Sequence, residues 1–146
     1  MTEYTAYFNG EWVPYSEVRI EPRDRGFLAG DVVFDVAPEA WPILTDLDGN
    51  LTEGTGYNLL LVSNGTIRSP RDRSILQGVS RDVVFELAEQ LQIPVVEEDL
   101  QPYDLYTADE AFFASTIMYV LPVTSADKRQ IGDGKPGTVT QQLLAA

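Results

Sequence analysis

The sequence predicts an α+β domain that is rich in β-strands, with a mixed sheet packed against one or two helices. Short segments of alternating apolar and polar residues, separated by Asn-Gly and Asp-Gly turns, indicate strands joined by tight connections. One later segment has apolar residues at helical spacing. The length of 146 residues fits one ordinary domain, and a hydrophobic content of 44% excludes a wholly disordered chain.

Strands are expected wherever a short apolar or alternating run lies between turn-forming residues. These ranges are 4–8, 11–14, 18–20, 32–36, 43–45, 57–62, 66–68, 95–97, 111–114 and 119–123. The dipeptides Asn9-Gly10 and Asn64-Gly65 each lie between two such runs and predict hairpin turns, because both residues tolerate a positive φ. Asp48-Gly49 predicts a further turn.

The clearest helix is predicted over residues 81–92. Its apolar residues fall on one face at spacings of three and four residues, and they are Val83, Val84, Leu87, Ala88 and Leu91. Ser80 is the expected N-cap, because its hydroxyl can accept a backbone N–H of the first turn, and Pro94 marks the end. A polar loop over residues 125–137 and a short helix near residues 138–145 follow.

Residues 37–42 contain two prolines, which break any regular element and mark the only plausible domain boundary. Residues 22–31 contain two glycines and read as a loop. We therefore predict an N-terminal part over residues 1–37 and a larger part over residues 41–146.

Composition excludes several classes of function. Lys and Arg number 10 against 23 Asp and Glu, so the formal net charge is −13, and general electrostatic binding to nucleic acid or an anionic membrane is not expected. The absence of Cys and His excludes disulfides, thiolate nucleophiles, histidine-ligated zinc and Ser-His-Asp triads. We predict no metal site. A mechanism that needs a buried reactive amine must use Lys128 or Lys135, the only two lysines.

The N-terminal residues have neither the basic nor the apolar region of a secretory signal. No window of the sequence approaches the ~20 apolar residues of a membrane span. We therefore predict a soluble, cytoplasmic protein with neither a nucleic acid nor a membrane as a partner.

Three short segments carry residues that could bind a ligand. Glu53 precedes a Gly-x-Gly bend and could be aimed at a cationic ligand atom, or it could be a solvated loop residue. The N–H groups of Val79 and Ser80 could hold an anion at a helix start, or Ser80 could be an ordinary N-cap. Ser115 and Thr116 could bind phosphate oxygens at a strand end, or they could form an ST-turn.

Other charged segments have simpler interpretations. Residues 23–31 could form a ligand-facing loop or a salt-bridged surface turn. The pairs Glu97-Glu98 and Asp109-Glu110 are most simply solvated edges, since a catalytic carboxylate pair needs a spatial separation that a sequence does not give. The sequence has no Walker-type phosphate loop and no dinucleotide-binding fingerprint.

Taken in order, these segments resemble the fold-type IV pyridoxal phosphate (PLP) enzymes, which include branched-chain and D-amino-acid aminotransferases and (R)-selective amine transaminases. Residues 7–36 resemble the N-terminal segment of that family, and residues 41–146 resemble its C-terminal portion. The matching motifs in the C-terminal portion are Leu51–Asn58, Leu76–Arg81, Ala108–Thr116, Leu121–Thr124 and Ile131–Gly137. The Gly26-Phe-Leu loop and the lead-in Trp41–Asp46 look closest to the amine transaminases.

The resemblance implies amino-group transfer between an amine or amino acid and a 2-oxo acid, with PLP as cofactor. Glu53 matches the family glutamate that pairs with the pyridine nitrogen of PLP. Val79 and Ser80 match the residues whose N–H groups hold the cofactor phosphate, and Ser115 and Thr116 match the second phosphate-binding pair. Because family members are usually dimers, the resemblance also implies a homodimer.

The sequence departs from the family at one large point. Only four residues join Val36 to Trp41, where the family has a long stretch with the phosphate-binding arginine and the Schiff-base lysine. Lys128 and Lys135 do not replace that lysine, since they lie in a polar loop where an amine stays charged. We therefore predict an internally truncated, catalytically deficient homologue with no catalytic residue, in which residues 1–37 are a remnant of the small domain. The alternative is a non-catalytic binding or interaction module with at most weak binding of PLP or phosphate.

Overall fold

The computed structural model describes residues 5–8, 11–18 and 41–146. The chain divides into two compact units, Met1–Phe34 and Asp35–Ala146. The predicted loop over residues 22–31, the predicted strand over residues 32–36 and residues 37–40 of the proline-rich boundary lie outside the described residues.

The first unit contains the predicted N-terminal hairpin. Strand β1 (Thr5–Phe8) pairs antiparallel with β2 (Glu11–Pro14), with Tyr7 opposite Trp12. A single 3-10 turn, η1 (Tyr15–Glu17), follows. A strand is predicted over residues 18–20. In the structure Val18 is not part of a strand, and residues 19 and 20 lie outside the described residues.

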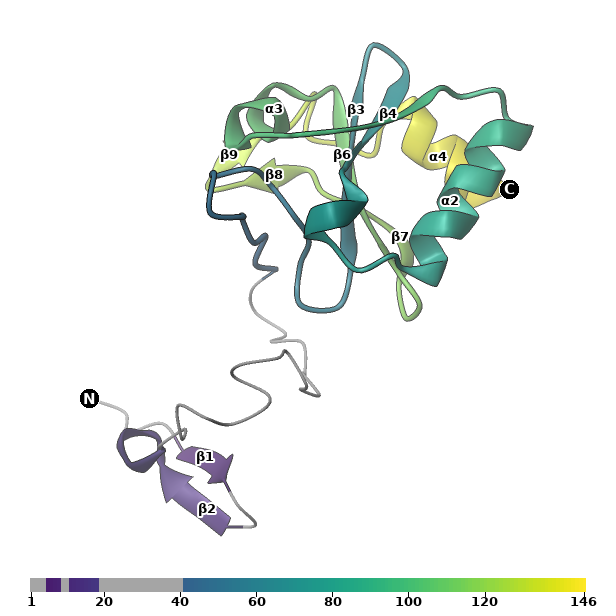
Figure 1. Ribbon diagram of the computed structural model, residues 1–146. Helices are drawn as coiled ribbons and strands as arrows, with labels where there is room; N and C mark the ends of the chain where they lie inside the picture. The colour runs from purple at the N-terminus through teal and green to yellow at the C-terminus, as the bar shows by residue number, and fades with distance from the viewer. Residues whose placement is uncertain (1–4, 9–10, 19–40) are drawn as a thin grey trace. The chain divides into compact units, whose positions relative to one another are not determined.

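The second unit is built on a five-stranded mixed sheet with the strand order β5-β4-β3-β6-β7 (Figure 1). Its strands are β3 (Asn58–Ser63), β4 (Thr66–Pro70), β5 (Val95–Glu98), β6 (Glu110–Ser115) and β7 (Tyr119–Pro122). Strands β4 and β5 are parallel, and the other neighbours are antiparallel. The parallel pair is joined through η2 (Asp72–Ser74) and α2 (Val79–Gln90), because parallel strands need a long crossover. The predicted α+β fold with a mixed sheet is confirmed.

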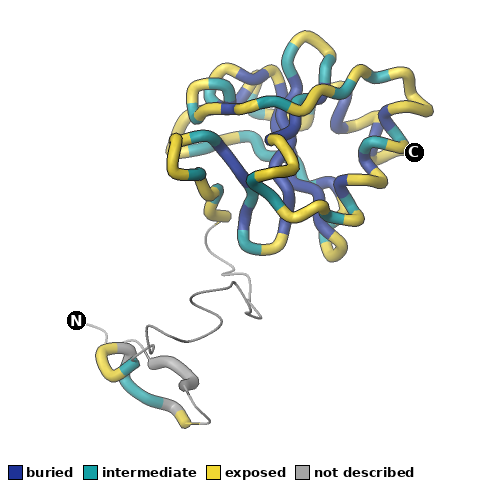
Figure 2. Tube along the Cα trace, in the orientation of Figure 1, coloured by how far each residue is buried: buried dark blue, intermediate teal, exposed yellow. Residues whose placement is uncertain are grey.

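Helices α2 and α4 (Thr138–Ala145) cover one face of the sheet (Figure 1). Leu60 and Val62 of β3 share a core there with Val84 and Ala88 of α2 and with Leu143 of α4. Strand β3 is buried along nearly its whole length, as Figure 2 shows for the central strands. Because both faces of this strand are covered, its sequence is a continuous apolar run rather than an alternating one.

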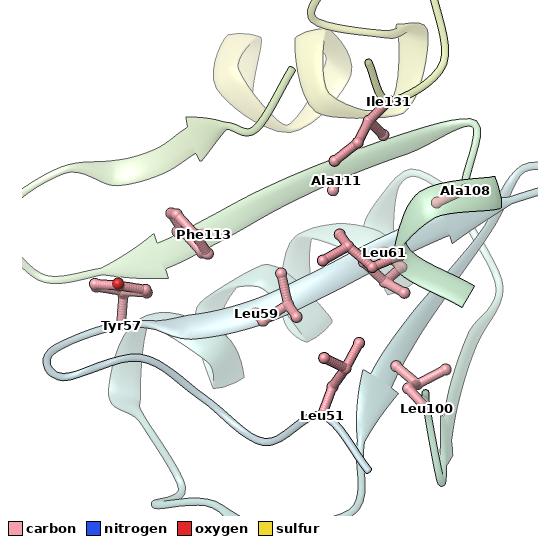
Figure 3. Packing of buried hydrophobic residues seen from close by; sticks show 10 residues of the cluster. Leu51, Tyr57, Leu59, Leu61, Leu100, Ala108, Ala111, Phe113 and Ile131 are labelled. Carbon is pink, nitrogen blue, oxygen red and sulfur yellow. The ribbon is translucent and has the colours of Figure 1, made fainter. Parts of the chain in front are cut away.

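The opposite face carries a second core, which includes Leu59 and Leu61 of β3 and Phe113 of β6 (Figure 3). Helix α3 (Pro102–Thr107) and the hairpin of β8 (Ser125–Ala126) and β9 (Arg129–Gln130) lie on this side of the sheet (Figure 1). Within the described residues, no helix is both long enough and apolar enough to cross a membrane.

Several local predictions differ from the structure. Residues 125–137, predicted as a polar loop, contain the β8–β9 hairpin. Residues 43–45 form no strand, and a single isolated bridge to Leu51 stands in its place. Helix α3 is absent from the sequence prediction. Helix α3 begins with a capping box between Gln101 and Asp104, and Pro102 is its first helical residue. These are real start signals, but a helix of six residues is too short to display an apolar period.

Glu110 is a buried residue, which corrects the prediction of a solvated edge. Its carboxylate accepts hydrogen bonds from the N–H groups of Val139 and Thr140, both at 2.9 Å, and from the Thr140 hydroxyl at 2.7 Å. A Cβ on Gly137 would overlap this carboxylate, so glycine is required there. The start of α4 offers unpaired N–H groups and the positive end of a helix dipole, which favour a carboxylate. Asp109 is exposed, as predicted.

Replacing Glu110 with Gln is expected to lower the free energy of unfolding by about 1.5 to 3 kcal/mol, the range for hydrogen bonds to a charged group. In glutamine an NH2 group replaces one carboxylate oxygen, so that a donor faces the donors at the start of α4. Urea unfolding followed by circular dichroism measures the change. Glu86→Gln on the exposed side of α2 is the matched control, and an equal loss in both variants would contradict the assigned role of Glu110.

Candidate functional site

Three segments of the second unit meet around Asn58, the first residue of β3. In the sheet, Asn58 lies opposite Ala114, which precedes Ser115 at the end of β6. Its side-chain amide donates to Glu53 at 3.0 Å and to the carbonyl of Leu76, just before α2, also at 3.0 Å. The three segments predicted to bind a ligand are therefore neighbours in space.

Glu53 lies in the bend before β3, where its backbone forms an isolated bridge with Asn58. Both of its carboxylate oxygens accept the N–H of Leu76 at 3.1 Å, and Oε2 also accepts the Asn58 amide. The side chain is half-buried. Burial raises the pKa of the Glu53 carboxyl above its ordinary value, and the hydrogen bond from Leu76 opposes that rise.

The bend behind Glu53 needs the glycine at position 54 for space. A Cβ on Gly54 would overlap the ring of Tyr57. That ring packs on Phe113 of β6 with centroids 4.2 Å apart, and its hydroxyl donates to the carbonyl of Pro42 at 2.8 Å. Packing against the sheet therefore fixes the bend, and with it the backbone of Glu53.

Helix α2 begins at Val79 with Gly78 as its N-cap, so the prediction of Ser80 as the N-cap is wrong. Gly78 is extended, and a Cβ there would overlap the side-chain oxygen of Asn58. A glycine at position 78 leaves room for this close approach. Val79 and Ser80 are the first two helical residues, and the N–H groups of a first turn have no partner within the helix.

Ser115 and Thr116 have different surroundings. Ser115 is buried, and its hydroxyl oxygen accepts the N–H of Met118 at 3.1 Å, which is the ST-turn alternative. Thr116 is exposed. The hydroxyl hydrogen of Ser115 is still available as a donor, because the turn uses only its oxygen.

Val79, Ser80 and Thr116 line one depression of about 470 Å³ between α2, α4 and the start of β7. The other residues of its lining are Val83, Val84, Leu87, Tyr119, Val120, Leu143 and Leu144. Glu53 and Ser115 are not part of that lining. The structure therefore brings together the helix start and the threonine, and it joins Glu53 to the helix start through Leu76.

The two lysines lie elsewhere. Lys128 is exposed in the turn between β8 and β9, and Lys135 is exposed in the loop before α4. Neither lines the depression that Ser80 and Thr116 share.

A larger cavity of about 720 Å³ lies on the other face of the sheet. It is bounded by residues of the 41–51 segment, by α3 and by residues 121–127. None of the predicted site residues lines it. Trp41, Leu105 and Phe113 are among its apolar lining residues. Asp127 also lines it and accepts the Tyr106 hydroxyl at 2.6 Å.

Sequence reasoning missed two residues that build the site, Asn58 and Arg81. Arg81 is buried, donates to the Ser69 hydroxyl at 3.0 Å, pairs with Glu97 and lies over the ring of Phe85. These contacts fasten the start of α2 to β4 and β5. A cation in the first turn of a helix opposes the helix dipole, so its presence there is a signal that a partner exists.

The carboxyl carbon of Glu53, followed by NMR, is expected to titrate at a higher pH than the same residue in the urea-unfolded chain. Because the native state holds this proton more tightly, stability falls as pH rises between the unfolded and the folded pKa values. Glu53→Gln is expected to remove this part of the pH dependence. If Glu53 titrated in the folded chain at the same pH as in the unfolded chain, or at a lower one, the description of Glu53 as a desolvated carboxyl would be contradicted.

Comparisons with known proteins point to one family. The family model for amino-transferase class IV matches residues 35–126. A protein of Methanocaldococcus jannaschii is 45% identical over 101 residues, which cover 68% of this chain and 35% of that protein. The branched-chain-amino-acid aminotransferase of Escherichia coli strain K12 is 39% identical over 105 residues, which cover 71% of this chain and 34% of that protein.

Solved structures give the same result. The branched-chain amino acid aminotransferase of E. coli matches with a TM-score of 0.70 at 39% identity, over 71% of this chain and 34% of that one. The enzyme of Thermotoga maritima, itself described as a putative branched-chain amino acid aminotransferase, matches with a TM-score of 0.69 at 36% identity, over 73% and 39%. A third branched-chain amino acid aminotransferase, complexed with N-(5'-phosphopyridoxyl)-L-glutamate, matches with a TM-score of 0.67 at 37% identity, over 69% and 34%.

These matches cover most of this chain but a much smaller share of the proteins compared. The chain spans about a third of the length of the curated relatives it matches. The family model covers more than half of the chain, and the curated relatives and the solved structures agree with it. On this evidence, the chain belongs to the class IV aminotransferase family.

Proposed function

We propose that this chain is an internally truncated class IV aminotransferase homologue that holds PLP without a covalent bond and is deficient in amino-group transfer. The observation that carries the proposal is the position of its two lysines. Lys128 and Lys135 are exposed and lie outside the depression that Ser80 and Thr116 share. A lysine that attaches a carbonyl cofactor must be partly desolvated to be neutral and nucleophilic, and an exposed lysine stays charged.

The proposed cradle consists of Glu53, Val79, Ser80, Ser115 and Thr116, and its donor set fits PLP. The unpaired N–H groups at the start of α2 and the nearby hydroxyls suit a phosphate. The structural relative that is complexed with a phosphopyridoxyl compound supports this assignment. When bound, PLP supplies an electron sink for a substrate carbanion.

Each residue of the cradle has its own task in this proposal, and that of Val79 is to offer its backbone N–H to the phosphate. The ionised Glu53 carboxylate accepts a hydrogen bond from a protonated ring nitrogen and balances its charge. Ser80 and Thr116 donate their hydroxyl hydrogens to phosphate oxygens. Ser115 donates as well, while its oxygen continues to accept the N–H of Met118.

The truncation accounts for the missing chemistry. The chain spans about a third of its relatives, and we propose that residues 1–37 are a remnant of the small domain and residues 41–146 the cradle domain. The stretch that would supply the lysine and the phosphate-binding arginine is then missing between them. In an intact relative, the reaction transfers an amino group between an amine or amino acid and a 2-oxo acid.

The names of the relatives favour branched-chain amino acids as the ancestral substrates. The proposed similarity to the amine transaminases is based only on the N-terminal loop and on the Trp41–Asp46 lead-in. A homodimer in the cytoplasm completes the proposal, on the pattern of the family.

A second candidate is a non-catalytic binding or interaction module, and exposed apolar side chains favour it. Val79, Ile117 and Tyr119 are 77%, 84% and 75% exposed, and all three belong to the segments around the depression. Exposed apolar side chains that cluster in this way mark surfaces that bind another molecule.

Titration of the purified chain with PLP is expected to give a saturable absorbance change, and borohydride is expected to leave no reduced cofactor on either lysine. Peptide mass spectrometry reads the adduct, and a Lys128→Arg, Lys135→Arg double variant is the control. A cofactor-dependent turnover of amino acid and 2-oxo acid, together with an adduct on a lysine, would refute the deficiency. Binding that never saturates would instead favour the interaction module.

Ser80→Ala and Thr116→Val are each expected to weaken PLP binding about tenfold to a hundredfold, the effect of one hydrogen bond to a charged group. Binding of pyridoxal, which has no phosphate, should change in neither variant. Fluorescence titration with both ligands gives the comparison, and Ser125→Ala on exposed β8 is the control. Equal losses for PLP and pyridoxal would be inconsistent with a phosphate site at the start of α2.

A further inference from the structure

We propose that Asn58 is a positioning residue, whose side-chain amide fixes the Glu53 carboxylate and the start of α2 in one arrangement. The inference rests on the proposed function where it concerns PLP, because Glu53 and the start of α2 are the two ends of the proposed cradle. Its geometric part rests on contacts within the chain alone.

The amide of Asn58 is buried, with 6% of the residue exposed, and all of its polar atoms face the cradle segments. Nδ2 donates to Glu53 Oε2 and to the Leu76 carbonyl, each at 3.0 Å. The side-chain oxygen lies against Gly78, where a Cβ would overlap it. One side chain therefore contacts the residue at the ring end of the cradle and the residue that caps the helix at its phosphate end.

The backbone of Asn58 adds a third connection. It pairs with Ala114 in the sheet, directly before Ser115 and Thr116. Strand register moves in steps of a whole residue, so this pairing fixes the end of β6 relative to Asn58. The positions of all three parts of the proposed cradle are therefore fixed relative to Asn58.

Asparagine is chemically suited to this position. Its NH2 group has two hydrogens and can donate to a carboxylate and to a carbonyl at the same time. An aspartate would offer no donor when ionised, and a leucine of similar size would offer neither a donor nor an acceptor. A buried amide whose donors are both used is also costly to displace.

The Asn58 side chain carries no charge, and this affects what Glu53 can bind. An arginine or lysine in this place would pair with Glu53 and compete with a cationic ligand atom, whereas an amide leaves the negative charge available. The charged side chains of the neighbouring segments have other partners: Arg81 pairs with Glu97, Arg73 with Asp99, and Asp72 accepts the Gln77 amide. Glu53 is therefore held by neutral donors.

Asn58→Asp is the sharpest test, because a protonated Asp can donate as the amide does. Near neutral pH the two carboxylates repel, and PLP binding is expected to weaken roughly tenfold to a hundredfold. As the pH is lowered until the pair shares one proton, affinity should return toward that of the unchanged chain at the same pH. Asn58→Leu should lose affinity at both pH values and recover at neither.

The matched control is Asn50→Asp, since Asn50 also donates its amide to a carboxylate, that of Asp46 at 3.1 Å. PLP affinity should not change in that variant. Asn58→Asp with the affinity and the pH profile of the unchanged chain would overturn the inference.

NMR on the chain without PLP separates this inference from the proposed function. The side-chain amide signal of Asn58 should move with the titration of Glu53, and Asn58→Asp should raise the pKa of Glu53. These signals test the contact even if PLP does not bind, and the amide signal does so even if a variant fails to fold. If the NMR signal of the Asn58 side-chain amide did not change as Glu53 titrates, the inference would be overturned. Failure of PLP to bind the unchanged chain would overturn only the proposed function.

Discussion

The hydrogen bonds of one buried amide, that of Asn58, hold the candidate site together. A buried amide must keep its donors and its acceptor satisfied, so the segments that contact it cannot move independently without loss of stability. Glu53 and Leu76 receive its hydrogens, and Gly78 leaves room for its oxygen. The position of Asn58 is set in turn by β3, which is buried on both faces and carries both cores of the unit.

Local signals in the sequence predicted most of the fold. The Asn64-Gly65 turn has a positive φ at both residues, as the dipeptide requires, and the apolar spacing predicted α2 to within two residues at each end. The predicted N-cap was wrong: the helix begins two residues earlier, after Gly78, where a Cβ would overlap the side-chain oxygen of Asn58. Glu110 was misjudged because the helix that buries it begins far along the sequence.

The candidate site was predictable to the extent that its residues carry their own chemistry. A carboxylate beside a tight bend, N–H groups at a helix start and hydroxyls at a strand end are all visible as residue types. Asn58 gave no comparable signal, because an asparagine at the start of a strand suggests no role until its partners are known. The turn that uses the oxygen of Ser115 was one of two alternatives in the sequence, and the structure contains that turn.

The residues of the proposed cradle also serve the fold. Glu53 accepts from Leu76 and Asn58, Gly78 makes room for Asn58, and Ser115 closes a turn. Losing these contacts forces an overlap at Gly78 or leaves polar groups unpaired, the buried amide of Asn58 among them, whether or not a cofactor is present. A lysine that only carries a cofactor has no such second task. If the chain is deficient in amino-group transfer as proposed, these contacts are a reason to keep the cradle residues that does not depend on catalysis.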